Sequence, residues 1–98
     1  MTTTTPNRSP NVALPVGTVE ADRWEDIDAQ PWRTVTFLRH QVTDSDARAS
    51  MNACQHADGR IDEYEVVVIG DHLNSDQARE LAAVLLEAAA EIDRQVTR

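Results

Sequence analysis

Lysine is absent from this 98-residue chain, and all nine basic residues are arginines. Without lysine the chain cannot form a Schiff base with a carbonyl substrate, and it cannot build a P-loop, whose motif requires a lysine. Seventeen acidic residues outnumber the nine basic ones and give a formal net charge of −8. Such a charge disfavours contact with nucleic-acid phosphates and with anionic membrane surfaces. We therefore expect no direct nucleic-acid binding and no membrane contact.

Cysteine and long apolar runs are almost as scarce. The one cysteine, Cys54, cannot close a disulfide within the chain, which favours a reducing cytoplasm as the compartment. Residues 1–15 are rich in threonine and proline and lack the apolar stretch of a signal peptide, so no leader is expected. The longest apolar run, over residues 81–86, is far too short to span a bilayer. The sequence thus predicts a cytoplasmic protein.

A single small domain preceded by a flexible tail is the expected organisation. The length of 98 residues leaves room for one domain. Pro6, Pro10 and Pro15 interrupt any helix or strand near the N-terminus. We therefore predict a disordered tail over residues 1–15 and one domain over residues 16–98.

The first half of this domain is expected to hold two strands. Residues 16–28 contain few apolar positions without a clear period and predict a short first strand, and residues 28–31 have the composition of a turn. Residues 32–42 are rich in β-branched and aromatic residues, which is typical of a longer strand. Alternation along that strand places Val35 and Phe37 on one face with Arg33 and Arg39, and Thr34, Thr36 and Leu38 on the other.

Asp58-Gly59 is the clearest turn, because both positions of a tight two-residue hairpin loop must accept a positive φ. If Ala57 and Arg60 close this loop, Cys54 lies opposite Glu63. One face of the hairpin is then apolar and holds Ala49, Met51, Ala53, Tyr64, Val66 and Val68. The other face is mixed and holds Ser50, Asn52, Cys54, His56, Ile61, Glu63, Glu65 and Val67. The alternative is a short helix over residues 46–56, which contain good helix formers.

A long amphipathic helix is expected to end the chain. Asn74 is the predicted N-cap, with Gln77 completing a capping box, and Ser75 is the alternative cap. At 100° per residue, one arc of apolar residues faces the sheet. This arc contains Ala78, Leu81, Ala82, Leu85, Ala88, Ala89, Ile92 and Val96. The predicted fold class is therefore α+β, a three- to four-stranded antiparallel meander packed by one long C-terminal helix.

The apolar surface of this helix is wider than one sheet face can cover. Val84 and Leu86 flank the arc on its two sides, and Glu80, Glu87 and Glu91 form an acidic side. These five residues are the predicted interface with a second copy of the chain or with another protein. A basic partner would offset the repulsion between Glu87 and Glu91, which lie one turn apart.

Cys54 and His56 have a spacing that suggests chemistry, because residues two apart on a strand point to the same side. A thiol beside an imidazole can act as nucleophile and base, and with His40 or His72 the pair could ligate a metal. A second pair of closely spaced ligands is missing, and Glu63 opposite Cys54 would oppose a thiolate. We therefore predict no catalytic residue, no cofactor and no metal, with a metal- or thiol-dependent enzyme as an alternative.

Acidic clusters are the remaining candidates for a site. One contains Asp22, Glu25, Asp26 and Asp28, and the other contains Asp62, Glu63 and Glu65. Paired carboxylates can hydrolyse glycosides, but a small chain with an aromatic content of 4% can hardly build the cleft. Residues 44–46 lack the central glycine and the later ligands of a calcium loop. Solvated acidic surface is the expected interpretation, and an acidic inhibitor or nucleic-acid mimic that binds a basic protein is the alternative.

Two stretches carry a resemblance: residues 55–61, Gln-His-Ala-Asp-Gly-Arg-Ile, and residues 77–93, which begin Gln-Ala-Arg-Glu-Leu-Ala. The chain resembles small uncharacterised proteins of mycobacteria, related actinobacteria and mycobacteriophages, which share an Ala-Asp-Gly hairpin turn and a final Gln-Ala-Arg-x-Leu-Ala helix. The resemblance implies a strand-rich front half, a terminal helix and an actinobacterial or phage source. It implies no activity and no catalytic residues.

Taken with the composition, these patterns predict a non-enzymatic protein that acts by protein–protein contact. The expected partner is a second copy of the chain, in a homodimer, or another protein. A relation to phage proteins is expected as well.

Overall fold

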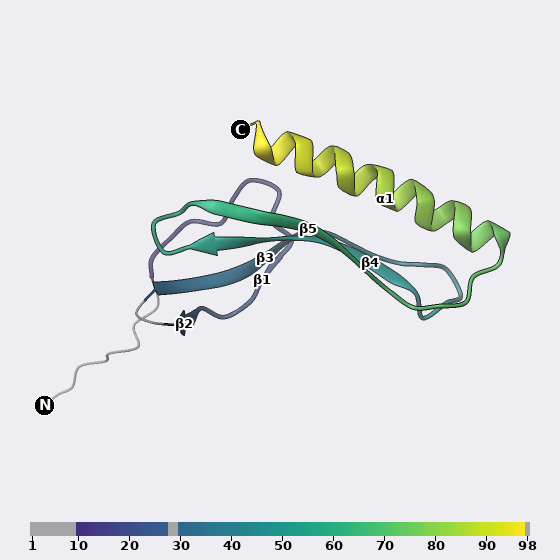
Figure 1. Ribbon diagram of the computed structural model, residues 1–98, viewed down its shortest axis with the longest axis horizontal. Coiled ribbons are helices and arrows are strands. Elements are labelled where there is room, and N and C mark those ends of the chain that lie inside the picture. The colour runs from purple at the N-terminus through teal and green to yellow at the C-terminus, as the bar shows by residue number, and fades with distance from the viewer. Residues whose placement is uncertain (1–9, 28–29, 98) are drawn as a thin grey trace, which may run out of the picture.

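The computed structural model describes residues 10–27 and 30–97 (Figure 1). Its elements are β1 (Glu20–Ala21), β2 (Glu25–Ile27), β3 (Gln30–Gln41), β4 (Arg48–His56), β5 (Ile61–Ile69) and α1 (Ser75–Val96). β3, β4 and β5 form an antiparallel meander, and β1 and β2 both pair with the outer edge of β3. Figure 1 shows α1 lying along one side of the sheet. The predicted α+β class is confirmed.

The N-terminal segment crosses the face of the sheet that α1 covers. Gln55, a buried residue of β4, donates its side-chain amide to the Ala13 carbonyl at 2.8 Å and accepts the Arg33 Nε–H at 2.7 Å. Gln95 of α1 is also buried and donates to the Val16 carbonyl at 2.8 Å. A disordered tail was predicted over residues 1–15, of which residues 1–9 lie outside the described residues. From residue 10 onward, the two glutamines hold the segment against the sheet and the helix.

The single strand predicted over residues 16–28 is wrong in detail, because two short strands occupy this stretch. β1 and β2 are separated by a break at residues 22–24, where the Trp24 ring stacks on the guanidinium of Arg33 with the carbon 4.3 Å from the ring centroid. Gln30 and Pro31, predicted in a turn, already belong to β3. The other two residues of that turn, 28–29, lie outside the described residues.

The β4–β5 hairpin is confirmed, and the alternative helix over residues 46–56 is wrong. Its loop, however, has three residues instead of two. The His56 N–H donates to the Arg60 carbonyl at 2.8 Å, so these two residues close the loop. Gly59 has a φ of +93°, which a three-residue hairpin loop requires at its last position and which glycine adopts without strain.

One bulge in β3 and another in β5 change which side chains share a face of the sheet. In β3 the register with β4 shifts between Thr36 and Leu38, so Leu38 pairs with Met51 and packs against the core, whereas the prediction placed it on the face of Thr34 and Thr36. In β5 the register shifts at Glu63, whose φ is +55°. The three-residue loop places Cys54 opposite Asp62 instead of the predicted Glu63, and this bulge restores the predicted register from Asn52 and Glu65 onward.

Two further assignments change, the first because of the three-residue loop and the second because of the bulge in β3. Ile61 pairs with Gln55 and packs against the core, not on the mixed face. Arg39 pairs with Ser50 and leaves the face that holds Val35. The core that results lies between the meander and α1, and its buried cluster consists of Val35, Phe37, Met51, Ala53 and Ala88.

The start of α1 is confirmed, because Asn74 caps the helix and Gln77 completes the capping box. The Gln77 N–H donates to the Asn74 side chain at 2.8 Å, and the Asn74 N–H donates to the Gln77 side chain at 2.9 Å. The face that α1 turns to the sheet differs from the predicted arc by a rotation of roughly 70°, at 100° per residue. Val84, with 6% exposure, and Ala88 point inward, whereas Ala82 and Ala89 of the predicted arc are exposed.

In the part of the chain that the structure describes, no helix is both long and apolar enough to cross a membrane.

Candidate functional site

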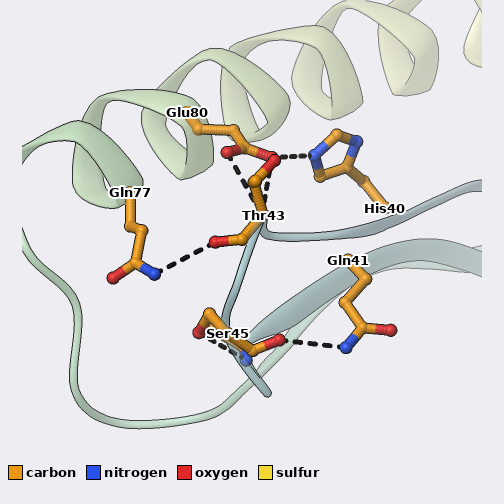
Figure 2. A network of polar contacts seen from close by, with 7 residues as sticks. His40, Gln41, Thr43, Ser45, Gln77 and Glu80 are labelled. Carbon is orange, nitrogen blue, oxygen red and sulfur yellow. Dashed lines mark hydrogen bonds and ion pairs between the residues drawn. The ribbon is translucent and has the colours of Figure 1, made fainter.

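Polar side chains attach the first turns of α1 to the β3–β4 loop (Figure 2). The Glu80 carboxylate lies 2.6 Å from His40 Nε2 and accepts the Thr43 N–H at 3.1 Å. Gln77 donates to the Thr43 carbonyl at 3.0 Å. These hydrogen bonds hold the pKa of Glu80 below its ordinary value, the contact with His40 being the largest cause.

The last turns of α1 are attached in a similar way. Besides its bond to Val16, Gln95 donates to the Glu91 carboxylate at 2.8 Å, and Arg94 Nε donates to the same carboxylate at 2.9 Å. Each of three polar side chains of α1 has a partner in the body of the protein and turns toward it. These side chains are Gln77, Glu80 and Gln95. This explains the rotation of α1, since the apolar pattern alone would have faced another side to the sheet.

Because of this rotation, some of the predicted interface residues face the body of the protein and others face solvent. The prediction that Val84 lies on a free flank is wrong, because Val84 packs against the sheet. Glu80 and Glu91 are engaged in the contacts described above. Leu86 is 74% exposed and Glu87 is exposed too, so these two residues remain available for contact.

The rotation leaves an apolar strip on the side of α1 that faces β5. Ala82, Ala89 and Val96 are exposed and follow one another at intervals of seven residues, so they share one side of the helix. Val96 lines a groove with Ile61 and Tyr64 of β5, whereas Glu80 on the other side contacts the end of β3. The strip formed by Ala82, Ala89 and Val96 therefore borders the β5 side of the sheet.

β5 itself is the open edge of the sheet among the described residues, because its one strand partner is β4. Its first half carries Asp62, Glu63 and Glu65 together with the bulge, whereas its second half, residues 66–69, is uncharged. Val66 and Val68 lie on the helix side with exposures of 36% and 46%. Charges and bulges discourage pairing at a free edge, so the second half of β5 is the unprotected part.

Arginines flank this unprotected part on the face of the sheet opposite α1. Arg39, Arg48, Val67 and Ile69 line a shallow groove of about 250 Å³. Arg48 lies directly opposite Ile69 in the register of β4 and β5. Arg48 thus places a positive charge beside the apolar half of β5, whereas Arg39 is paired with Glu20.

A second candidate site lies at the hairpin end of the same face. Cys54 and His56 project from β4, and Asp62 projects from β5 directly opposite Cys54. One potential ligand atom from each of the three residues lies within 4.8 Å of the others, and His56 Nε2 is 2.9 Å from Asp62 Oδ1. A groove of about 460 Å³, lined in part by Trp32, Glu63, Cys54 and His56, opens beside the cluster.

The electrostatics of this cluster oppose a free thiolate. Burial raises the pKa of the Cys54 thiol, and the negative charges of Asp62 and Glu63 raise it further. Arg60 acts in the opposite direction but does not reverse the shift. A nucleophilic cysteine needs electropositive surroundings, so the cluster is poorly suited to the thiol chemistry considered from the sequence.

The partners that the sequence suggested for Cys54 and His56 lie elsewhere. His40 faces α1 on the other side of the sheet, and His72 lies beyond the end of β5, with Nε2 3.6 Å from Asp71. The third residue near Cys54 and His56 is instead Asp62. Sequence reasoning missed Asp62 because the hairpin loop has three residues instead of the predicted two, which shifts the pairing beside the loop by one residue.

Comparison of the chain with protein-family models, curated proteins and solved structures found no match. The resemblance to small actinobacterial and phage proteins therefore stays a prediction.

Proposed function

We propose that this protein is a non-enzymatic, cytoplasmic protein that acts by contact and forms a homodimer through the outer edge of β5. The observation that supports the proposal most is the uncharged second half of β5, which is open and partly exposed on the helix side. A free strand edge offers unpaired N–H and C=O groups, and an antiparallel copy of the same strand can satisfy them.

The sequence of β5 favours one register for this pairing. A twofold axis at Val67, perpendicular to the sheet, sets Val66 opposite Val68 of the second copy and Glu65 opposite Ile69 of the second copy. An axis at Glu65 would instead place two carboxylates opposite each other, which is unfavourable. We therefore assign the axis to Val67.

Charge is also distributed favourably in this register. Glu65 of one copy lies beside Ile69 of the other, and Arg48 is the next residue in that row across the sheet. Glu65 of each copy thus lies in the same row as Arg48 of the other copy. This local attraction offsets part of the repulsion expected between two chains of charge −8.

The helices add apolar surface to the same interface. A twofold axis perpendicular to the sheet keeps both α1 helices on one face of a continuous sheet. The strip of Ala82, Ala89 and Val96 then borders the junction together with Val66 and Val68. Small alanine side chains permit close approach of neighbouring helices, so the strip suits contact with a second helix.

The two alternative functions have less support. An acidic inhibitor would bind its basic partner through Glu80, Glu87 and Glu91, but the carboxylates of Glu80 and Glu91 already form hydrogen bonds within the chain. A thiol-dependent enzyme would need a reactive Cys54, whose pKa is raised instead. Contact through β5, in contrast, uses a strand edge that no other strand of the described residues pairs with.

Sedimentation velocity over a concentration series tests the proposal. We expect a dimer whose fraction rises with concentration and changes little with salt, because strand pairing and apolar burial dominate the interface. A strict monomer at the highest soluble concentration would contradict the homodimer. Retention of a basic partner at low salt, with loss at high salt and without dimerisation, would instead favour the acidic inhibitor.

A further inference from the structure

The cluster of Cys54, His56 and Asp62 brings three different donor atoms together on a rigid part of the fold. Cys54 and His56 are two residues apart on β4 and point to the same side, and Asp62 faces Cys54 across the β4–β5 ladder. Among the described residues, their sulfur, nitrogen and oxygen atoms form a group in which each atom lies within 4.8 Å of the others. The sheet thus presents them in nearly fixed positions.

These distances are close to what a small tetrahedral ion requires. Zinc binds sulfur at about 2.3 Å and nitrogen or oxygen at about 2.0–2.2 Å, so that ligand atoms around it are about 3.3–3.7 Å apart. The contact between His56 Nε2 and Asp62 Oδ1, at 2.9 Å, would open by a few tenths of an ångström. Because no separation exceeds 4.8 Å, the others would close by at most about one ångström, which side-chain rotation can supply.

The surroundings favour a cation over an anion. Glu63 and Glu65 line the adjoining groove, and Glu63 adds to the negative field at Cys54. Arg60 is the one described cation near the cluster, with its Nε 3.7 Å from Asp62. The groove gives access from solvent and leaves room for a fourth ligand such as water.

We propose that Cys54, His56 and Asp62 form a binding site for a divalent transition-metal ion, with zinc preferred. Thiolate and imidazole donors select zinc and its neighbours over magnesium and calcium, which prefer oxygen ligands alone. On binding, the Cys54 thiol releases its proton to solvent and its sulfur bonds to the ion. The fourth position faces the groove.

This site is independent of the proposed dimer. The cluster lies at the hairpin end of β4 and β5, whereas the twofold axis lies at Val67 near the other end. Failure of one proposal therefore leaves the other standing.

Titration of chelator-treated protein with Co²⁺, a spectroscopic substitute for Zn²⁺, tests the site. We expect one ion per chain, a thiolate-to-cobalt charge-transfer absorption, and loss of that absorption when Zn²⁺ displaces Co²⁺. Cys54→Ser is expected to abolish the absorption. His56→Asn and Asp62→Asn should each weaken binding by at least about tenfold, whereas His72→Asn, at an exposed histidine outside the cluster, should leave it unchanged.

A measurement on the unaltered chain keeps the test decisive if a variant fails to fold. Zn²⁺ should slow the alkylation of Cys54, because the metal-bound sulfur is shielded. The site would be refuted if the unaltered protein gave no charge-transfer absorption, if Cys54→Ser retained it, or if Zn²⁺ left the alkylation rate unchanged.

Discussion

The two edges of the sheet differ in how they are protected. The outer edge of β3 is covered by the short strands β1 and β2, and Glu20 of β1 forms an ion pair with Arg39 of β3. The outer edge of β5 has no such cover among the described residues, and its second half lacks charge altogether. Proteins usually protect a free edge with charges, bulges or extra strands. The proposed pairing of two copies rests on this contrast.

The same substitution at the two edges gives the largest expected difference. Val68→Lys places a charge in the proposed β5–β5 junction and should weaken dimerisation by roughly 100-fold, or about 3 kcal/mol. Val19→Lys is the matched control, because Val19 is 64% exposed and lies next to β1 at the other edge. Sedimentation equilibrium measures both constants. Equal dimerisation of the two variants would contradict an interface at β5.

The rotation of α1 predicts the next largest effect. Val84→Ala removes buried methyl groups and should lower the free energy of unfolding by about 2 kcal/mol. Leu86→Ala, on the exposed side, should change it by less than about 0.5 kcal/mol. Urea unfolding at one low chain concentration measures both values. Similar losses for the two variants would contradict the rotation, because Val84 and Leu86 lie symmetrically on the two flanks of the arc that the apolar pattern alone predicts.

The bulge in the first half of β5 offers a smaller test. Glu63 has a φ of +55°, which costs an ordinary residue more than it costs glycine. Glu63→Gly should therefore raise the free energy of unfolding by about 0.5 kcal/mol. Glu65→Gly, in regular strand, should lower it by about 1 kcal/mol. A similar decrease in the free energy of unfolding for both variants, measured by urea unfolding, would contradict the bulge.

The contact between Glu80 and the β3–β4 loop predicts the smallest effect, a dependence of stability on pH. Because the folded state lowers the pKa of Glu80 below its ordinary value of 4.5, the carboxylate stabilises the fold above that pH. This contribution is lost as the pH falls through the lowered pKa. In thermal unfolding, Glu80→Gln should narrow the difference in melting temperature between neutral and acidic pH, whereas exposed Glu87→Gln should not. A profile unaltered by Glu80→Gln would argue against the contact.

Short-range patterns predicted most of the fold. The β-branched and aromatic residues of β3, the Asp58-Gly59 turn and the Asn74–Gln77 capping box each act within a few residues, so the sequence displays them directly. Strand pairing from Ala49 opposite Val68 to Asn52 opposite Glu65 agrees with the register that the turn predicted. The fold class follows from these elements.

The rest depended on contacts between distant parts of the chain. The inward turn of Glu80 and Gln95 requires His40, Thr43 and Val16, which lie far from α1 in sequence. The apolar arc carries no information about these partners, so the side of the helix that faces the sheet was predicted wrongly. Asp62 was missed for a different reason, because the Asp58-Gly59 pair was assigned to a two-residue loop, and the three-residue loop is what places Asp62 opposite Cys54.

Amide hydrogen exchange along β5 tests the central claim most directly. If two copies pair through this strand, the outward-pointing amides of residues 65–69 become protected as the concentration rises, while those of Glu20 and Ala21 in β1 keep their rates. Exchange at the β5 amides that is equally fast at low and high concentration would contradict a dimer built on this edge.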